Sequence, residues 1–168
     1  MKTLRMMLLL GVAACTTPGT AQEAASGAAV PATPAPFAGS WESCQGASTP
    51  EECARYVLVQ RGRRVCGTWF YVASGQAYQG RVVAHAISPT QARRTHVCGR
   101  PGSETGTECD DGWESIDRPL LLCGGGLADL VRKDGSCMAD YRPVGAAEGD
   151  VSALLIQPWV QQCLLADR

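Results

Sequence analysis

The nine cysteines of this 168-residue chain constrain its fold more than any other feature of the sequence. Eight of them are dispersed from residue 44 onward: Cys44, Cys53, Cys66, Cys98, Cys109, Cys123, Cys137 and Cys163. No C-x-x-C pair occurs and neither histidine stands at ligand spacing from a cysteine pair, so a metal site is not indicated. An even, dispersed set predicts up to four disulfides, provided that the chain reaches an oxidising compartment. The pairing stays open, although local closures such as Cys44 with Cys53 or Cys98 with Cys109 are plausible.

The first 14 residues have the pattern of an export signal. Lys2 and Arg5 precede an apolar run over residues 6–14, and small residues end that run. The run is too short to span a bilayer, because a spanning helix needs about 20 apolar residues. We therefore expect residues 1–14 to be removed on export, which supplies the oxidising compartment that disulfides require.

The residues at the end of this signal, Val12-Ala13-Ala14-Cys15, resemble the lipobox of bacterial lipoproteins. The resemblance implies that the Cys15 thiol carries a diacylglycerol and that the new amino terminus is acylated, which is sufficient for stable membrane anchoring. It also accounts for the ninth cysteine. Thr16 follows, where aspartate would resemble an inner-membrane retention signal, so the outer membrane facing the periplasm is favoured. The alternative is an ordinary secretory signal with a chance cysteine.

Residues 15–36 are predicted to be a lipidated cysteine followed by a disordered tether. The segment consists mainly of Ala, Pro, Thr, Gly and Ser, with Glu23 as its single charge, and it offers little to a core. Residues 37–168 are left as one disulfide-stapled domain.

Strand patterns dominate the first part of this domain. Residues 54–60, 64–73, 78–87 and 91–98 are rich in β-branched and aromatic side chains and are separated by Gly, Pro and Ser. Shorter runs at 120–123, 127–131 and 137–141 add candidate strands. Gly67 and Gly80 inside strand patterns suggest bends. The prediction is an all-β fold, a small antiparallel meander or barrel of about seven to eight strands, because closure removes exposed sheet edges.

The tail is predicted to form a short, broken helix. Asp150 is the expected N-cap, and Leu154, Leu155, Trp159 and Cys163 recur at roughly helical spacing. Pro158 should kink or restart this helix, and Cys163 offers a covalent tie to the barrel.

Gly39-Ser40-Trp41, followed by Gln60, Gly62, Val65, Gly67 and Trp69, resembles the start of calycin-type barrels of the lipocalin and avidin superfamily. The resemblance covers about 50 residues, and it implies a cup with a possible cavity. Eight cysteines are more than lipocalins usually carry.

Charge is unevenly distributed, although the totals of 15 basic and 16 acidic residues nearly balance and do not indicate a nucleic-acid partner. Eight arginines and no acid lie between residues 55 and 100, and six acids and no base lie between 101 and 117. Arg61, Arg63 and Arg64 form a candidate binding tip for carboxylates or phosphates. The alternative is that the basic and acidic segments pair with each other. Calcium binding by the acidic segment is not indicated, since its spacing is not that of an EF-hand loop.

Ser74 to Tyr78, together with Arg81, loosely resembles the loop of membrane-bound lysozyme inhibitors, which are also small disulfide-bearing lipoproteins. In that family the loop enters the lysozyme cleft. Here the loop is shorter and lacks the basic residue before Tyr78, and a plain hairpin turn is the alternative.

No nucleophile elbow or phosphate-binding loop is present in the sequence, and His85 and His96 are interpreted as surface or structural residues. The sequence therefore predicts a non-catalytic binding module without a cofactor. A protein partner in the envelope, bound in the manner of an inhibitor or immunity factor, is the first hypothesis. A lipocalin-like carrier of a small apolar ligand is the alternative.

Overall fold

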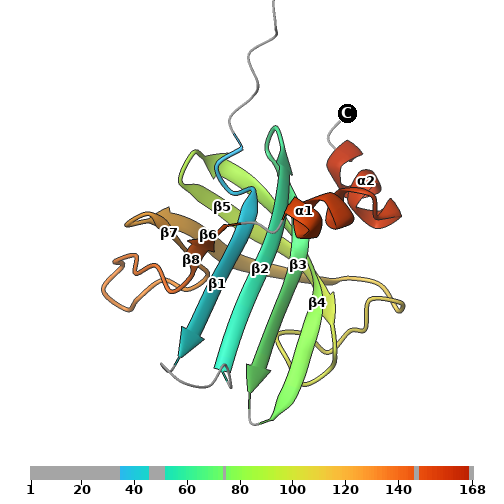
Figure 1. Cartoon of the computed structure of the whole chain (residues 1–168), viewed down its shortest axis with the longest axis horizontal. Helices are drawn as coiled ribbons and strands as arrows, with labels where there is room; N and C mark the ends of the chain where they lie inside the picture. Colours follow the sequence, from blue (N-terminus) through green and yellow to red (C-terminus); the bar gives the residue numbers. More distant parts are fainter. Residues whose placement is uncertain (1–34, 46–51, 74, 146–147, 167–168) are drawn as a thin grey trace, which may run out of the picture. The chain divides into compact units, whose positions relative to one another are not determined.

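The computed structural model describes residues 35–45, 52–73, 75–145 and 148–166. These residues form eight strands and two helices. The strands are β1 (Gly39–Gln45), β2 (Glu52–Arg61), β3 (Arg64–Ala73), β4 (Gln76–Ser88), β5 (Gln91–Gly99), β6 (Glu114–Cys123), β7 (Gly126–Ala128) and β8 (Arg142–Val144). The helices are α1 (Glu148–Leu155) and α2 (Pro158–Leu165). The predicted all-β fold with a broken C-terminal helix is confirmed (Figure 1).

The strands form one antiparallel sheet in the order β7-β6-β5-β4-β3-β2-β1-β8. The sheet curls until its two short edge strands meet. Leu127 in β7 and Tyr141, just before β8, exchange backbone hydrogen bonds of 2.9 and 3.0 Å. A nearly closed barrel results, in which both edges are covered at a single narrow seam.

One row of residues in the barrel interior crosses four strands. Trp41 lies opposite Tyr56, Tyr56 opposite Trp69, and Trp69 opposite Gly80. A Cβ atom added to Gly80 would come within 2.4 Å of the Trp69 indole, and one added to Gly99 within the same distance. The two glycines therefore leave the space that the indole occupies, so Gly80 serves a close approach inside the barrel.

The strand patterns of the sequence did not include β1, and after residue 110 the strand boundaries also differ from the predictions. β6 begins six residues before the predicted run at 120, and β7 ends at Ala128 rather than at residue 131. The predicted strand at 137–141 is wrong, since β8 occupies Arg142–Val144 and only Tyr141 contributes a bridge. Short edge strands carry too few alternating residues to be located from sequence.

Four disulfides join the eight predicted cysteines and confirm the framework. Two are the local closures, Cys44–Cys53 and Cys98–Cys109. Cys123–Cys137 ties the segment between β7 and β8 to the end of β6. Cys66–Cys163 joins α2 to β3 across 97 positions of sequence. Cys15 lies outside the described residues.

The helices cover the outer face of β2 and β3. Leu154 and Val160 pack against Val59 and Cys66 in a second apolar core outside the barrel. Pro158 restarts the helix at the first turn of α2, as predicted. The predicted N-cap role of Asp150 is wrong, because α1 already begins at Glu148. No helix within the described ranges is long and apolar enough to cross a bilayer.

The two ends of the barrel have different closures. At one end Phe37, with no exposed surface, donates its backbone N–H to Gln60 and accepts a hydrogen bond from the indole of Trp41. The β2–β3 and β4–β5 turns lie at this same end, because alternate turns of a meander share an end. At the other end lie the β3–β4 turn and the segment 100–113 between β5 and β6.

Candidate binding groove

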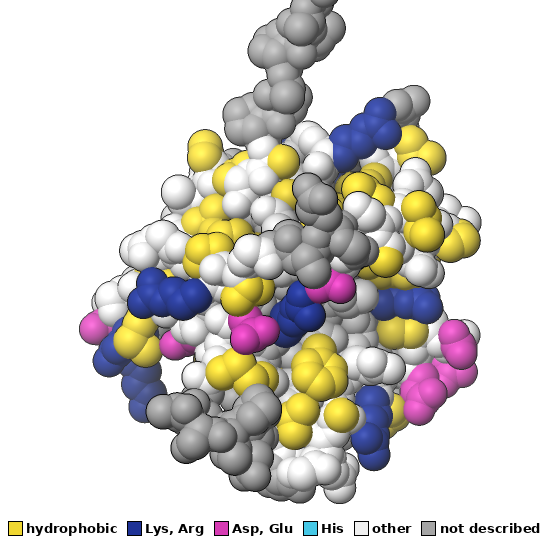
Figure 2. Space-filling model, viewed as in Figure 1, with side chains coloured by type: hydrophobic (Ala, Val, Ile, Leu, Met, Phe, Trp, Pro, Cys, Tyr) yellow, Lys and Arg dark blue, Asp and Glu magenta, His cyan; other side chains and the backbone are white. Residues whose placement is uncertain are grey.

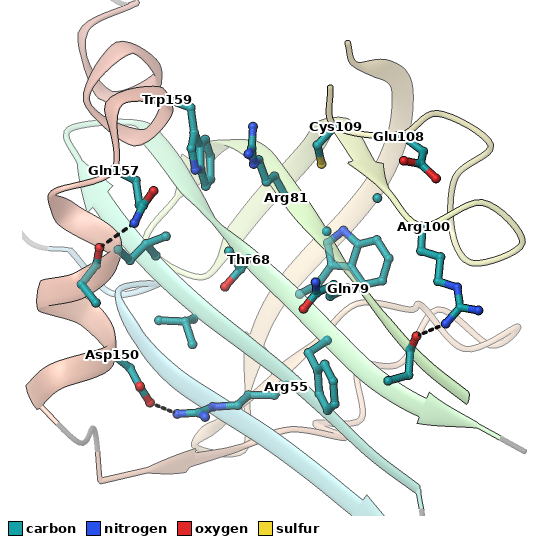
Figure 3. Close-up of a pocket in the computed structure, with 18 of the residues that line it drawn as sticks. Arg55, Thr68, Gln79, Arg81, Arg100, Glu108, Cys109, Asp150, Gln157 and Trp159 are labelled. Atoms are coloured by element: carbon teal, nitrogen blue, oxygen red, sulfur yellow. Dashed lines mark hydrogen bonds and ion pairs between the residues drawn. The ribbon is translucent and has the colours of Figure 1, made fainter. Parts of the chain in front are cut away.

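A groove of about 830 Å³ lies on the outside of the barrel. Its floor is the outer face of β2, β3 and β4, one wall is formed by α1 and α2, and the opposite wall includes Glu108 to Asp110 of the β5–β6 segment (Figure 3). Its position follows from chain order: a meander supplies the floor, and the C-terminal helices return over it. The disulfide between Cys66 and Cys163 fixes α2 in this position.

The floor is built from the strand residues that alternate with the core. Trp69 points inward and is buried, whereas its neighbours Thr68 and Phe70 line the groove. Phe70 keeps 37% of its surface exposed and so contributes apolar ring surface to the floor. Gln79 and Val57 complete this stretch of floor. The floor thus combines apolar surface with hydrogen-bonding side chains.

Arg81 is the basic residue in the middle of the groove. Its guanidinium carbon lies 5.2 Å from the centre of the Trp159 ring, which is a cation–π distance. Trp159 in turn packs against Trp113, with ring centres 5.9 Å apart. Within the described part of the chain the Arg81 side chain has no hydrogen bond or ion pair, so its guanidinium N–H donors stay available to a ligand carboxylate.

An ion pair lies on one side of the groove and a hydrogen bond on the other. Arg55 forms an ion pair with Asp150 of α1. Asp150 therefore pairs with the barrel instead of capping a helix as predicted. On the other side Arg100 donates to the carbonyl of Ala77 at 2.8 Å and lies over the Tyr78 ring at 5.4 Å. Figure 2 shows basic, acidic and apolar side chains interleaved over the face that carries β1 to β4.

The structure separates the candidate binding residues that the sequence suggested. Arg61, Arg63 and Arg64 lie at the β2–β3 turn, and the turn that leads to Tyr78 lies at the opposite end of the barrel. Ser74 lies outside the described residues. Only Arg81 lies in the groove. The three arginines of the β2–β3 turn cannot form one site with Tyr78, because consecutive turns of a meander are separated by the length of a strand.

Tyr78 belongs to the interior face of the barrel and not to an exposed loop. It stacks on Tyr71 with ring centres 4.8 Å apart, and both rings pack against the core. In the loop that resembles the lysozyme-inhibitor loop, the tyrosine therefore lies under Arg100. Its ring helps to close this end of the barrel.

A buried polar network inside the barrel was not predicted. Arg94 is 2% exposed and donates to the Tyr56 hydroxyl at 2.9 Å and to Glu104 at 2.8 Å. The Asp129 carboxylate accepts hydrogen bonds from Tyr56 at 2.9 Å and from Tyr141 at 3.0 Å. Arg94 also donates to the Asp129 carbonyl at 3.0 Å. The network joins β2, β5 and the segment 100–113 to the seam between β7 and β8.

The network changes the acidity of its members. Desolvation by burial, and then the negative charge of Asp129, raises the pKa of Tyr56 and of Tyr141 above the ordinary tyrosine value. Burial lowers the pKa of Arg94, but its partners Tyr56, Glu104 and Asp129 outweigh that effect and keep the guanidinium charged. The network is therefore an ionised arginine between two carboxylates, with both phenols protonated.

The predicted pairing between basic and acidic segments holds for two arginines. Arg94 binds Glu104, and Arg93 binds Asp117 at 3.2 Å. Glu114 instead accepts hydrogen bonds from the Gly106 backbone and the Thr105 hydroxyl, which lower its pKa.

Comparison with known proteins finds no matching family model, no matching curated protein and no matching solved structure. The function of this chain therefore has to be inferred from its own sequence and geometry.

Sequence reasoning missed Trp159, Phe70 and Arg55 as groove residues and Arg94 as an interior residue. The sequence pattern places Trp159 in the tail helix but does not indicate that it faces a groove. The alternation in β3 does place Phe70 on the face opposite Trp69, but sequence does not show which face the helices leave open. The available signal for Arg94 is its position two residues after Ala92 in β5, because alternate strand residues share a face and Ala92 is buried in the core.

Among the described residues, Glu42, Cys44 and Cys53 bring potential metal-ligand atoms together. The two sulfurs form a disulfide and are not thiolate donors. The cluster carries no metal proposal.

Proposed function

We propose that this chain is a lipid-anchored envelope protein whose barrel is a non-catalytic binding module for a protein partner in the periplasm, of the inhibitor or immunity type. The single observation that supports this proposal best is the external groove with Arg81 and Trp159 at its centre. Tryptophan and arginine are the residue types that most often dominate protein–protein binding energy.

The groove suits a partner segment that carries a carboxylate beside an apolar group. Arg81 offers donors without an ionic partner among the described residues, and Phe70 offers exposed ring surface on the same floor. Disulfide attachment of α2 keeps the wall in place before binding, so less conformational entropy is lost when a partner arrives.

The anchor part of the proposal is supported by the lipobox-like residues that end at Cys15. Metabolic labelling with a fatty acid tests it directly. We expect label on the wild-type chain and none on Cys15→Ala, and equal labelling of the two would contradict the anchor.

The carrier alternative requires an internal cavity lined by alternate strand residues. Inside this barrel Trp69 occupies the space left by two glycines, and Arg94 with its partners occupies the seam side. A core filled by large and charged side chains weighs against an apolar ligand.

The binding proposal is tested with the mature chain, residues 15–168 with Cys15→Ser, immobilised and exposed to envelope extract. We expect a protein partner whose affinity falls at least about tenfold with Arg81→Ala and weakens with salt. Arg132→Ala is the matched control, because Arg132 is an exposed arginine outside the groove, and it should bind like the parent chain. Recovery of a lipid and no protein, or a loss with Arg132→Ala alone, would contradict the groove proposal.

A further inference from the structure

The end of the barrel where the described chain begins carries basic turns. The β2–β3 turn holds Arg61 and Arg63, both exposed, and the β4–β5 turn lies beside it. The Arg63 Nε atom donates to the Ala86 carbonyl at 3.0 Å and so joins the two turns. Phe37 fastens the incoming chain to the same end through Gln60.

Exposed apolar side chains lie beside Arg63 and on the C-terminal helices. Ile87 is 55% exposed and lines a hollow of about 400 Å³ together with Pro36 and Arg63. Ile156 is 78% exposed between the helices, and Leu165 is 44% exposed in the last turn of α2. Figure 1 shows α2 toward the same end of the barrel as the described residues that lead into β1, and Figure 2 shows apolar side chains gathered there beside a basic one.

The charges of the two barrel ends are opposite in sign. The charged side chains of the described turns at this end are Arg61, Arg63 and Arg64. The segment 100–113 at the other end carries one base, Arg100, and the acids Glu104, Glu108, Asp110 and Asp111, of which Glu104 is paired with Arg94. An anionic surface therefore attracts the first end and repels the second, which orients the molecule.

We propose that this end of the barrel docks on a bilayer surface that contains anionic lipid. Arg61 and Arg63 contact the headgroups, and Ile87, Ile156 and Leu165 enter the interface between headgroups and acyl chains. A bilayer is the occupant because the chain that leads back to Cys15 joins the domain at this end. The docked orientation leaves the groove floor on the side of the barrel accessible to a partner.

This inference rests on the proposed anchor only for bringing the domain to a membrane, and its test uses protein without lipid. The mature chain, residues 15–168 with Cys15→Ser, contains every described residue and all four disulfides. Its partition onto phosphatidylethanolamine vesicles with and without phosphatidylglycerol is measured by co-sedimentation.

We expect binding that requires phosphatidylglycerol, falls about fivefold with Arg61→Ser and falls roughly tenfold with Ile156→Ser. The matched control is Leu130→Ser with Arg132→Ser, an exposed apolar and basic pair on the β7–β8 segment, which should leave partition unchanged. Equal binding to both vesicle types, or a loss with the control pair alone, overturns the proposal. A dimer in solution that Ile156→Ser dissociates, without vesicle binding, assigns the surface to a second copy and also overturns it. Failure here leaves fatty-acid labelling at Cys15 untouched, so the two ideas are separable.

Discussion

Arg94 is a charged residue that the fold requires in its interior. A buried guanidinium is costly unless its charge and its N–H groups are matched, and here Glu104, Tyr56 and the Asp129 carbonyl provide the match. Asp129 is the second centre of this network, because its carboxylate accepts hydrogen bonds from two tyrosine hydroxyls. Removing one partner leaves the others unpaired in a medium of low polarity.

Asp129→Ala should destabilise the fold by about 3–5 kcal/mol, since it leaves the Tyr56 and Tyr141 hydroxyls without their acceptor and removes the carboxylate that lies 4.0 Å from Arg94. The measurement is urea unfolding with the disulfides intact. Asp117→Ala is the control: Asp117 pairs with Arg93 on the surface, where both side chains are more than half exposed, and it should cost at most about 1 kcal/mol. Similar costs for the two variants would show that the network adds little.

Alkaline pH should weaken the fold through the same network. The folded chain binds the phenolic protons of Tyr56 and Tyr141 more tightly than the unfolded chain does, because burial and Asp129 raise both pKa values above 10. This stabilisation is complete below about pH 10 and is lost as the pH rises further. Unfolding midpoints of the parent and Tyr141→Phe, measured from about pH 8 to about pH 11, should fall less steeply for the variant. Parallel curves would exclude Tyr141 as a source of the pH dependence.

At the scale of elements, α2 depends on the barrel for its place. It has eight residues, which is too short for stability in water, so the apolar contacts to Val59 and Cys66 and the disulfide at Cys163 hold it against β3. Trp159 on this helix forms the groove with Arg81. The groove therefore exists only while α2 is attached.

Cys66→Ala with Cys163→Ala should destabilise the chain and lower partner affinity together, because the bridge spans 97 positions and fixes the groove wall. The matched control removes Cys44 and Cys53, whose bridge spans nine positions. On loop entropy the long bridge should be worth about 2 kcal/mol more. Denaturant unfolding and partner binding are measured for both. Unchanged partner binding without the Cys66–Cys163 bridge would contradict the assignment of α2 to the site.

At the scale of the whole molecule, the fold is a filled barrel closed at a narrow seam and stapled in four places. The interior holds aromatic rings and an ionised network, and the groove that we propose as the binding site lies on the outer face. The two ends differ in charge, so the molecule has an inherent direction relative to a charged surface.

Thiol titration of the denatured, unreduced mature chain with Cys15→Ser should detect no free thiol, because all eight remaining cysteines are paired. Reduction of the denatured chain should release eight thiols. Two or more free thiols without reduction would remove at least one bridge and reopen cysteine chemistry.

The sequence by itself determined the strand-rich class, the disulfide framework and the restart of the helix at Pro158, because alternation, cysteine count and proline stereochemistry act locally. The tertiary structure decided which cysteines pair over long distances, as for Cys66 with Cys163. It also decided that Arg94 points inward and that Arg81, rather than the tip at Arg61, lies in the groove. These outcomes depend on the curvature that brings β7 to β8 and on the path of the tail, and both are set by packing between residues far apart in the chain.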